Sequence, residues 1–378
     1  MITQFGRAGI SMILDKSAFQ SFNNDQIVQL HRYYWLNITP ILVMEVLGDL
    51  KKDIEPGVIN SEKVAELSKK LSSFNSSINS HYSLLIQEEL TGKLTIPFYT
   101  PLIDTGVPVK MQDGNTGIWI EPSIERKSIN RWKEKDFNDI DKYLSKLWRD
   151  VTLKPDTLTN IKELLKKEIS EFKVLTKQTD IIDFLNASFN NPDLHLAILE
   201  LLVLEFSLSS KTISEIFYRW ETFDEKNLHR FAPYSMFCLK AKLFFYICLQ
   251  NVIIGTRPTN LLDLDYVYYL PFCRVFVSND KFHKQIVPYL ITQDQLFIKG
   301  KELKSDLIKI QEIKDKLSDD ELKRTHSEPP RVKELITYKI WNQMLKGWPP
   351  VEDWTPSDFE LNMANEMITK MRHAKPSK

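Results

Sequence analysis

The sequence contains little cysteine and little glycine, and neither residue is arranged for a familiar chemistry. Its three cysteines, Cys238, Cys248 and Cys273, are widely spaced and lie in apolar surroundings, so we expect buried free thiols rather than a zinc site or a disulfide framework. Only 11 glycines occur among 378 residues, and no P-loop, glycine-rich dinucleotide loop, HExxH or GxSxG motif is found. The common nucleotide-binding, zinc-protease and serine-hydrolase motifs are therefore excluded.

Long hydrophobic runs and an excess of charge of one sign are also missing. The longest apolar window, residues 243–255, contains Gln250 and Asn251 and is too short to span a membrane. No apolar stretch follows a basic start, so we expect a cytoplasmic protein without membrane association. The 50 basic residues balance the 50 acidic ones, so contact with a polyanion would depend on a local patch or a bound cation.

Acidic residues follow two apolar runs that are typical of buried strands. Residues 275–277 are β-branched or aromatic and lead into Ser278-Asn279-Asp280, which indicates a strand ending in a turn that starts a helix. Residues 8–14 form a second apolar run that ends at Asp15, and Ser17 is a plausible N-cap for the helix that follows. In open parallel sheets the functional crevice lies at the carboxyl ends of the strands, where both acids would lie.

Two further acids occur in predicted helices. Pro40 suits the first turn of a helix, and Glu45 lies on an otherwise apolar surface of that helix. A buried acid needs a partner, and we consider Lys16 or Arg274 for that role. Asp263 lies near the start of a second apparent helix, which runs to residue 270 just upstream of the 275–277 strand.

Together, these pieces resemble a PIN-like domain, a nuclease fold with a small parallel sheet between helices. The resemblance implies that Asp15, Glu45, Asp263 and Asp280 bind one or two Mg²⁺ or Mn²⁺ ions and that the protein cleaves RNA, less often DNA. Asp15 would be the central ligand, Asp263 and Asp280 would complete the site, and Glu45 would bind the second ion or orient water. Paired divalent ions can activate water and stabilise the phosphate without a side-chain base.

Four neighbouring residues are candidates for supporting roles. Ser278 would donate a hydrogen bond to a carboxylate or to a metal-bound water. Asn260 would cap the helix of Asp263 or contact the metal shell. Lys281 and His283 would lie at the rim of the crevice and touch the substrate, with His283 as a possible proton donor to the leaving oxygen or simply a solvated side chain.

A simpler interpretation is open for the acids themselves. Asp15 and Asp280 are also well placed to be ordinary helix N-caps, since aspartate is common at a strand-to-helix turn. Asp49 and Asp265 are expected to be solvated or to play secondary roles. The resemblance therefore requires Asp15 and Asp280 to bind metal, whereas the capping interpretation requires only that they accept hydrogen bonds from backbone N–H groups.

The fold class that we expect is α/β. Residues 1–50 and 235–300 would form a discontinuous PIN-like domain, a parallel sheet flanked by helices. Residues 51–234 would be a mainly α-helical insertion with a β-hairpin near 105–121, for which Asp113-Gly114 is the turn signal. Residues 301–378 would form a helical C-terminal extension.

The function that we expect is a divalent-metal-dependent endoribonuclease resembling PIN-domain toxins, acting in bacterial defence or growth arrest. Such an enzyme would need an inhibitor or sensor protein to restrain it, and an oligomer is compatible with the sequence. Two alternatives stay open: a catalytically inactive PIN-like interaction protein, and a structure-selective DNA nuclease.

Overall fold

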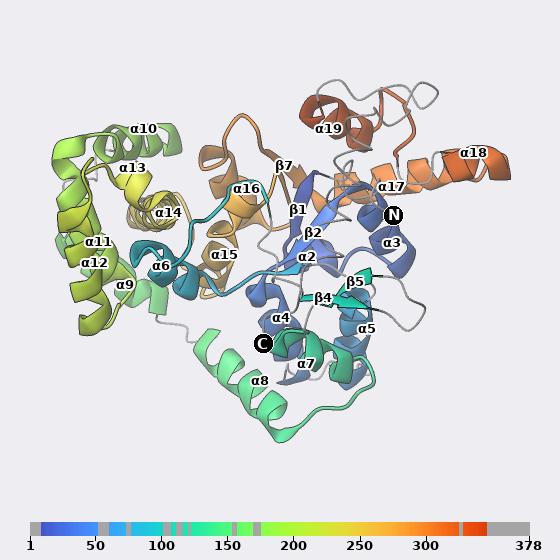
Figure 1. Ribbon diagram of the computed structural model, residues 1–378, viewed down its shortest axis with the longest axis horizontal. Coiled ribbons are helices and arrows are strands. Elements are labelled where there is room, and N and C mark those ends of the chain that lie inside the picture. The colour runs from blue at the N-terminus through green and yellow to red at the C-terminus, as the bar shows by residue number, and fades with distance from the viewer. Residues whose placement is uncertain are drawn as a thin grey trace.

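A computed structural model describes residues 9–51, 60–72, 77–100, 107–110, 116–119, 122–152, 157–168, 175–324 and 328–345 (Figure 1). Its central feature is a five-stranded sheet in the order β3-β2-β1-β6-β7, in which every neighbouring pair is parallel. The strands are β1 (Ser11–Leu14), β2 (Trp35–Ile38), β3 (Ser77–Ile78), β6 (Val275–Ser278) and β7 (Leu296–Lys299). The chain is therefore α/β, as predicted.

The two central strands explain the apolar runs that the sequence shows. Every residue of β1 and of β6 is buried, because helices cover both faces of a parallel sheet. Met12 is in register with Leu36 of β2 on one side and with Val275 of β6 on the other. Strand β7 lies at the edge of the sheet, next to β6.

Strands β2 and β3 were not predicted. Helix α3 (Asn24–Tyr33) ends just before β2, which Trp35 opens. Strand β3 is only two residues long and follows α5 (Asn60–Ser72). The sheet thus takes a strand from the segment that was expected to be an insertion.

Helices next to the sheet position the candidate site. Helix α2 (Lys16–Phe19) follows β1, and α4 (Pro40–Gly48) follows β2. Thr39 is the N-cap of α4, and Pro40 lies in its first turn, as predicted. The others near this edge are α15 (Asn260–Val267), which contacts α4, and α16 (Lys281–Ile286), which follows β6. These four helices begin or pass near the carboxyl edge of the sheet.

The segment between residues 51 and 234 contributes to two groups of helices. Helices α5, α7 (Ile124–Trp132) and α8 (Asp139–Thr152) pack with α4, and β4 (Val107–Lys110) and β5 (Thr116–Trp119) form the predicted antiparallel hairpin. The second group surrounds the 18-residue helix α14 (Pro233–Gln250), to one side of the sheet in Figure 1. It contains α6 (Tyr82–Leu90), α9 (Thr157–Glu168), α10 (Gln178–Phe189), α11 (His195–Glu205), α12 (Ser210–Thr222) and α13 (Leu228–Phe231).

Buried carboxylates join elements that are distant in sequence. Glu89 of α6 accepts hydrogen bonds from the backbone N–H groups of Tyr234 and Ser235 at the start of α14. Asp306 of α17 (Gly300–Lys314) does the same for Ile336 and Thr337 at the start of α19 (Ile336–Met344). Each carboxylate satisfies N–H groups that a helix start leaves without partners.

The remaining elements are short, and the last part of the chain lies outside the description. They are α18 (Asp319–Arg324) and the 3-10 helices η1 (Asp49–Lys51), η3 (Pro192–Leu194), η4 (Leu270–Phe272) and η5 (Val287–Tyr289). The expected hairpin turn at 113–114 and residues 346–378 of the expected C-terminal extension are not among the described residues. Over the described part of the chain, no helix combines the length and apolar character that crossing a membrane requires.

Candidate functional site

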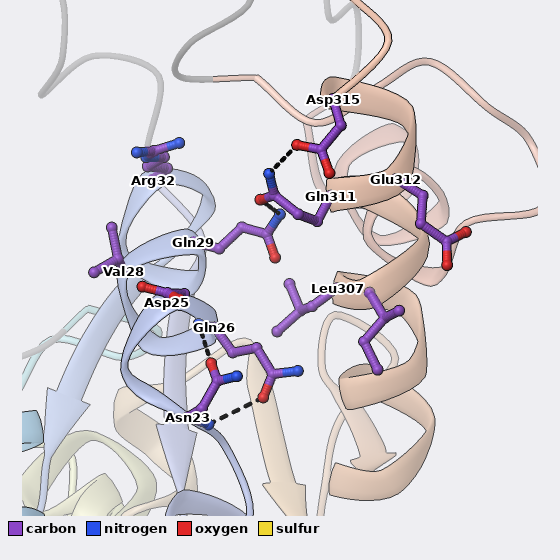
Figure 2. A pocket seen from close by; sticks show the side chains of 11 residues that line it. Asn23, Asp25, Gln26, Val28, Gln29, Arg32, Leu307, Gln311, Glu312 and Asp315 are labelled. Atoms are coloured by element: carbon purple, nitrogen blue, oxygen red, sulfur yellow. Dashed lines mark hydrogen bonds between the residues drawn. The ribbon is translucent and has the colours of Figure 1, made fainter.

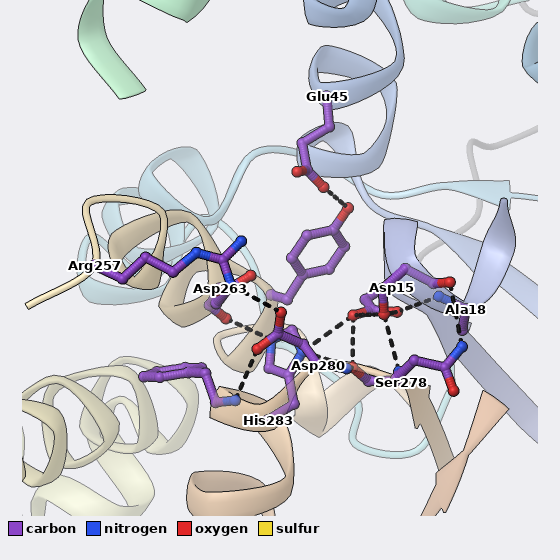
Figure 3. A network of polar contacts seen from close by, with 12 residues as sticks. Asp15, Ala18, Glu45, Arg257, Asp263, Ser278, Asp280 and His283 are labelled. Carbon is purple, nitrogen blue, oxygen red and sulfur yellow. Dashed lines mark hydrogen bonds and ion pairs between the residues drawn. The ribbon is translucent and has the colours of Figure 1, made fainter. Parts of the chain in front are cut away.

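Four acids from four elements lie near the carboxyl edge of the sheet (Figure 3). Asp15 directly follows β1 and is the N-cap of α2, and Asp280 follows β6 and is the N-cap of α16. Because β1 and β6 are parallel neighbours, their ends bring these two residues to the same edge. Asp263 comes from α15 and Glu45 from α4. Tyr266, also on α15, donates a hydrogen bond to Glu45.

Asp15 is buried, and both of its carboxylate oxygens are engaged. Oδ1 accepts from the backbone N–H of Ala18 at 2.8 Å, and the Ser17 hydroxyl lies 2.8 Å from both oxygens. Oδ2 accepts from the Ser278 hydroxyl at 2.6 Å, the bond to a carboxylate that we expected of Ser278. The expectation that Ser17 caps α2 is wrong, since Asp15 is the N-cap and Ser17 binds it.

His283 completes the surroundings of Asp15 from the opposite side. Its Nδ1 lies 3.2 Å from Asp15 Oδ2 and 2.9 Å from Ser278 Oγ, and its Nε2 lies 2.8 Å from the backbone oxygen of Asp263. A carbonyl oxygen only accepts, so Nε2 donates. Because the single Ser278 hydroxyl proton points to Asp15, Nδ1 must donate as well. This count of donors makes the ring an imidazolium.

Electrostatics supports a charged His283. Burial alone lowers the pKa of the imidazole, but the hydrogen bond and charge of Asp15, followed by the charge of Asp263, raise the pKa to about 9. The side chain is 0% exposed. Our prediction that His283 lies at the solvated rim is therefore wrong. A side chain with no exposed surface cannot donate a proton to a substrate in this conformation.

Asp263 has the least satisfied carboxylate of the four. Its Oδ2 is buried and finds no hydrogen-bond partner among the described residues. Burial, together with the charges of Asp280 and Glu45, raises the pKa of Asp263 to about 7 against the opposing positive charges of His283 and Arg257. A carboxylate in this position is stabilised by a proton or by a cation.

Asp280 combines a capping bond with a weak ion pair. Its Oδ1 accepts from the backbone N–H of Phe282 at 2.7 Å, as an N-cap does. Its Oδ2 lies 3.6 Å from the Arg257 guanidinium, whose side chain is 64% exposed. An exposed pair of this kind contributes little to stability, so Arg257 can leave Asp280 at low cost. The neighbouring Lys281 is exposed, as expected at a rim.

Glu45 is held by a residue that the sequence did not point to. The Tyr266 hydroxyl donates to Glu45 Oε2 at 2.5 Å. Burial raises the pKa of Glu45, while the charge of Lys16 and the Tyr266 bond oppose that shift. Arg274 is not its partner, because that guanidinium lies over the ring of Tyr99.

Lys16 reaches the backbone oxygen of Glu45 at 2.8 Å and forms an ion pair with Asp49, also at 2.8 Å. Asp49 is buried and also paired with Lys63, so the expectation that it is solvated is wrong. Asn260 does not cap α15 either: it lies inside the helix, and its amide donates to the backbone oxygen of Gly255 at 2.7 Å.

A separate recess lies away from the four acids. It measures about 540 Å³ and lies between α3 and α17 (Figure 2). Amide and charged side chains line this recess. The Gln311 amide, for example, donates a hydrogen bond to Asp315 at 2.7 Å. It contains none of the residues predicted for the site, so we place the candidate chemistry at the sheet edge.

Within the described residues, no group of three or more His, Cys, Asp or Glu side chains is arranged to hold a metal ion. No family model, curated protein or solved structure matches the chain. The site must therefore be interpreted from its own chemistry: a cluster of carboxylates with one oxygen unsatisfied, one buried imidazolium and one exposed guanidinium.

Three residues that shape the site were missed or misplaced by sequence reasoning. His283 carried a usable signal, because Phe282, Ile286 and Val287 around it are apolar and indicate a buried helix face. Tyr266 and Arg257 carried none, since each contact depends on how α15 and the loop before it approach other elements.

Proposed function

We propose that the protein is a divalent-metal-dependent nuclease that hydrolyses RNA, of the PIN-like kind that its sequence resembles. The observation that supports this most directly is the buried Asp263 carboxylate, whose Oδ2 lacks a partner among the described residues. The charges of Asp280 and Glu45 raise the pKa of Asp263, and the charge of Asp15 raises the pKa of Glu45. Like charges gathered in this way favour a bound cation.

The oxygen donors match a hard divalent ion in type, although their present arrangement does not hold one, since Mg²⁺ and Mn²⁺ prefer oxygen ligands. Asp263 and Asp280 would hold it, with Glu45 on the side of α4. Two contacts would have to exchange first: Arg257 would leave Asp280, and Glu45 would leave the Tyr266 hydroxyl. When bound, the ion supplies an activated water and stabilises charge on the phosphate.

Asp15 fits a different part of this proposal. Its oxygens are already taken by Ser17, Ala18, Ser278 and His283, so it would bind a metal directly only if His283 released it. We therefore assign Asp15 to holding the turn after β6, through Ser278, so that Asp280 is presented to the ion. In the same proposal, the exposed Lys281 and the released Arg257 contact phosphates of the substrate.

Metal-dependent cleavage tests the proposal. Wild-type protein should cut a fluorescently labelled RNA in Mg²⁺ or Mn²⁺ and not in EDTA, and Asp263→Asn and Asp280→Asn should each reduce the rate at least a hundredfold. Asp294→Asn, which changes an exposed carboxylate outside the site, should cleave like wild type. A wild-type protein that shows neither cleavage nor a metal-dependent rise in melting temperature would contradict it.

One observation favours the non-enzymatic alternative, a PIN-like interaction protein. Asp15, Glu45 and Asp280 each have a partner inside the protein, as expected of a site that no longer binds metal. Calorimetry separates the two, because an interaction protein would release no heat with Mg²⁺ or Mn²⁺. Matched RNA and DNA oligonucleotides decide between a ribonuclease and the structure-selective DNA nuclease.

A role in bacterial defence or growth arrest, with an inhibitor or sensor protein as partner, extends the same proposal. It predicts that the active protein slows growth when expressed alone and that Asp263→Asn does not. Equal growth of cells expressing either protein would speak against this role.

A further inference from the structure

Helix α15 has two different faces, and only one belongs to the acid site. Tyr266 donates to Glu45, and Asp263 bears the unsatisfied carboxylate. Leu261, Leu264, Asp265 and Tyr268 recur at the i, i+3, i+4, i+7 spacing of a second helix face, and all four line a recess of about 400 Å³. Asp263 and Asp265 are two residues apart, about 200° around the helix.

Aromatic rings form one wall of this recess. Tyr82 of α6 and Phe206, directly after α11, line it together with Tyr268. The ring centroids of Tyr82 and Tyr268 are 4.7 Å apart, and Phe206 meets both edge-on at 6.5 and 6.0 Å. The chain turns away after Phe206 through Ser207, whose φ of 51° is left-handed. The recess therefore offers aromatic surface of the kind on which an unpaired base stacks.

Charged groups line the rest of the recess. Lys242 of α14 forms a 2.9 Å ion pair with Glu205 and also donates to the Glu205 backbone oxygen at 2.6 Å. An ammonium has three donors, so one is left for a ligand. Asp265 is half-buried, and the Tyr82 hydroxyl is among its hydrogen-bond partners.

We propose that this recess binds a guanine base of the RNA substrate, stacked on Phe206, with Asp265 accepting from the base and Lys242 donating to it. Guanine presents two adjacent donors, N1–H and the N2 amino group, beside the acceptor O6. Two parallel donors match the two oxygens of a carboxylate, as in an arginine–carboxylate pair, and O6 matches the free Lys242 donor. Uracil has one donor between two acceptors, and adenine and cytosine have one amino donor beside an acceptor.

The position on α15 indicates where the guanine would lie in the substrate. A helix is about 10 Å across with its side chains, so a base in the recess belongs to a nucleotide close to the cleaved bond but not at it. That the base belongs to an RNA substrate rests on the proposed nuclease function. Binding of a free nucleotide nevertheless tests the recess without any cleavage.

Calorimetric titration of the full chain with GMP, AMP, CMP and UMP provides that test. We expect GMP to bind at least tenfold more tightly than the other three. Asp265→Asn, which replaces one acceptor by a donor, should weaken GMP binding at least tenfold, and Phe206→Leu, which removes the ring but keeps an apolar side chain, should weaken all four. Asp294→Asn should behave like wild type.

Cleavage of oligonucleotides with a single G at successive positions provides a second readout. Cleavage should concentrate at one fixed offset from the G and lose that preference in Asp265→Asn. Equal binding of all four nucleotides, or no binding of GMP, would overturn the guanine assignment, and metal-dependent cleavage that ignores G would do so while the nuclease proposal stands. GMP binding that depends on Asp265 in a protein that cleaves nothing would keep the recess and reject the nuclease.

Discussion

The imidazole Nδ1 of His283 lies 3.2 Å from Oδ2 of Asp15, and the two side chains are 0% and 4% exposed. They follow neighbouring parallel strands, so the pair joins the turns after β1 and β6. Removing one partner of a buried charge pair leaves the other uncompensated, which is far more costly than the net contribution of the pair itself.

His283→Gln should therefore destabilise the protein in a pH-dependent way. The raised pKa of His283 gives a contribution that is complete below pH 6.5 and lost as the pH rises through about 9. Unfolding by urea should show a loss of about 3 kcal/mol at pH 6 and a much smaller one near pH 10. His229→Gln is the control, because burial lowers the pKa of His229 instead of raising it; a loss that does not change with pH would contradict the charged assignment of His283.

Asp263→Asn should stabilise the metal-free protein at neutral and higher pH. An acid with a pKa raised to about 7 contributes stability that is present near pH 4 and lost as the pH rises through 7. The variant should match wild type at pH 4 and exceed it by about 2 kcal/mol at pH 8. Addition of Mg²⁺ should raise the melting temperature of wild type only, and an equal rise in the variant would exclude Asp263 as a ligand.

Tyr266→Phe removes the hydroxyl that donates to Glu45 and should cost about 1–3 kcal/mol, because a half-buried carboxylate loses its partner. Tyr33→Phe is a matched control, since the Tyr33 hydroxyl is buried and has no hydrogen-bond partner in the described part of the chain. That change should be neutral or stabilising. Thermal unfolding of both variants measures the difference, and similar losses would show that the Tyr266 bond contributes nothing.

Asp306→Ala should loosen the docking of α19. Its carboxylate accepts from the backbone N–H groups of Ile336 and Thr337 at 2.7 and 2.8 Å and from the Thr337 hydroxyl at 2.7 Å. We expect a loss of about 1–3 kcal/mol and faster hydrogen exchange confined to residues 336–344. Glu312→Ala, an exposed change on the same helix, should affect neither, and exchange that rises uniformly over the chain would contradict a local role for Asp306.

The sequence predicted those elements whose signals are local. Strands β1 and β6 are continuous apolar runs followed by capping aspartates, and α4 has Thr39 and Pro40 at its start. Strand β2 was missed because Tyr33 and Tyr34 continue the apolar pattern of α3 up to Trp35. Strand β3 was missed because two residues are too few to show the alternation of apolar and polar side chains that indicates a strand.

The acids were placed correctly near one edge, but their partners were not. Tyr266 is 221 residues from Glu45 in sequence, and His283 is 268 residues from Asp15. Contacts over such separations depend on how helices approach each other, and no local pattern encodes that. His283 illustrates the point, since its burial was readable from apolar neighbours but its charge depends on Asp15.

The pairing of β1 with β6 also has a consequence for synthesis. The contact between Ser278 and Asp15 closes a separation of 263 residues, so a ribosome makes most of the polypeptide before the central strand acquires its second neighbour. Until then β1 presents the unpaired backbone N–H and C=O groups of one edge to the surrounding solution. Closure over so long a loop is slow, and the nascent chain therefore depends on its early helices, or on a chaperone, to keep that edge from joining other chains.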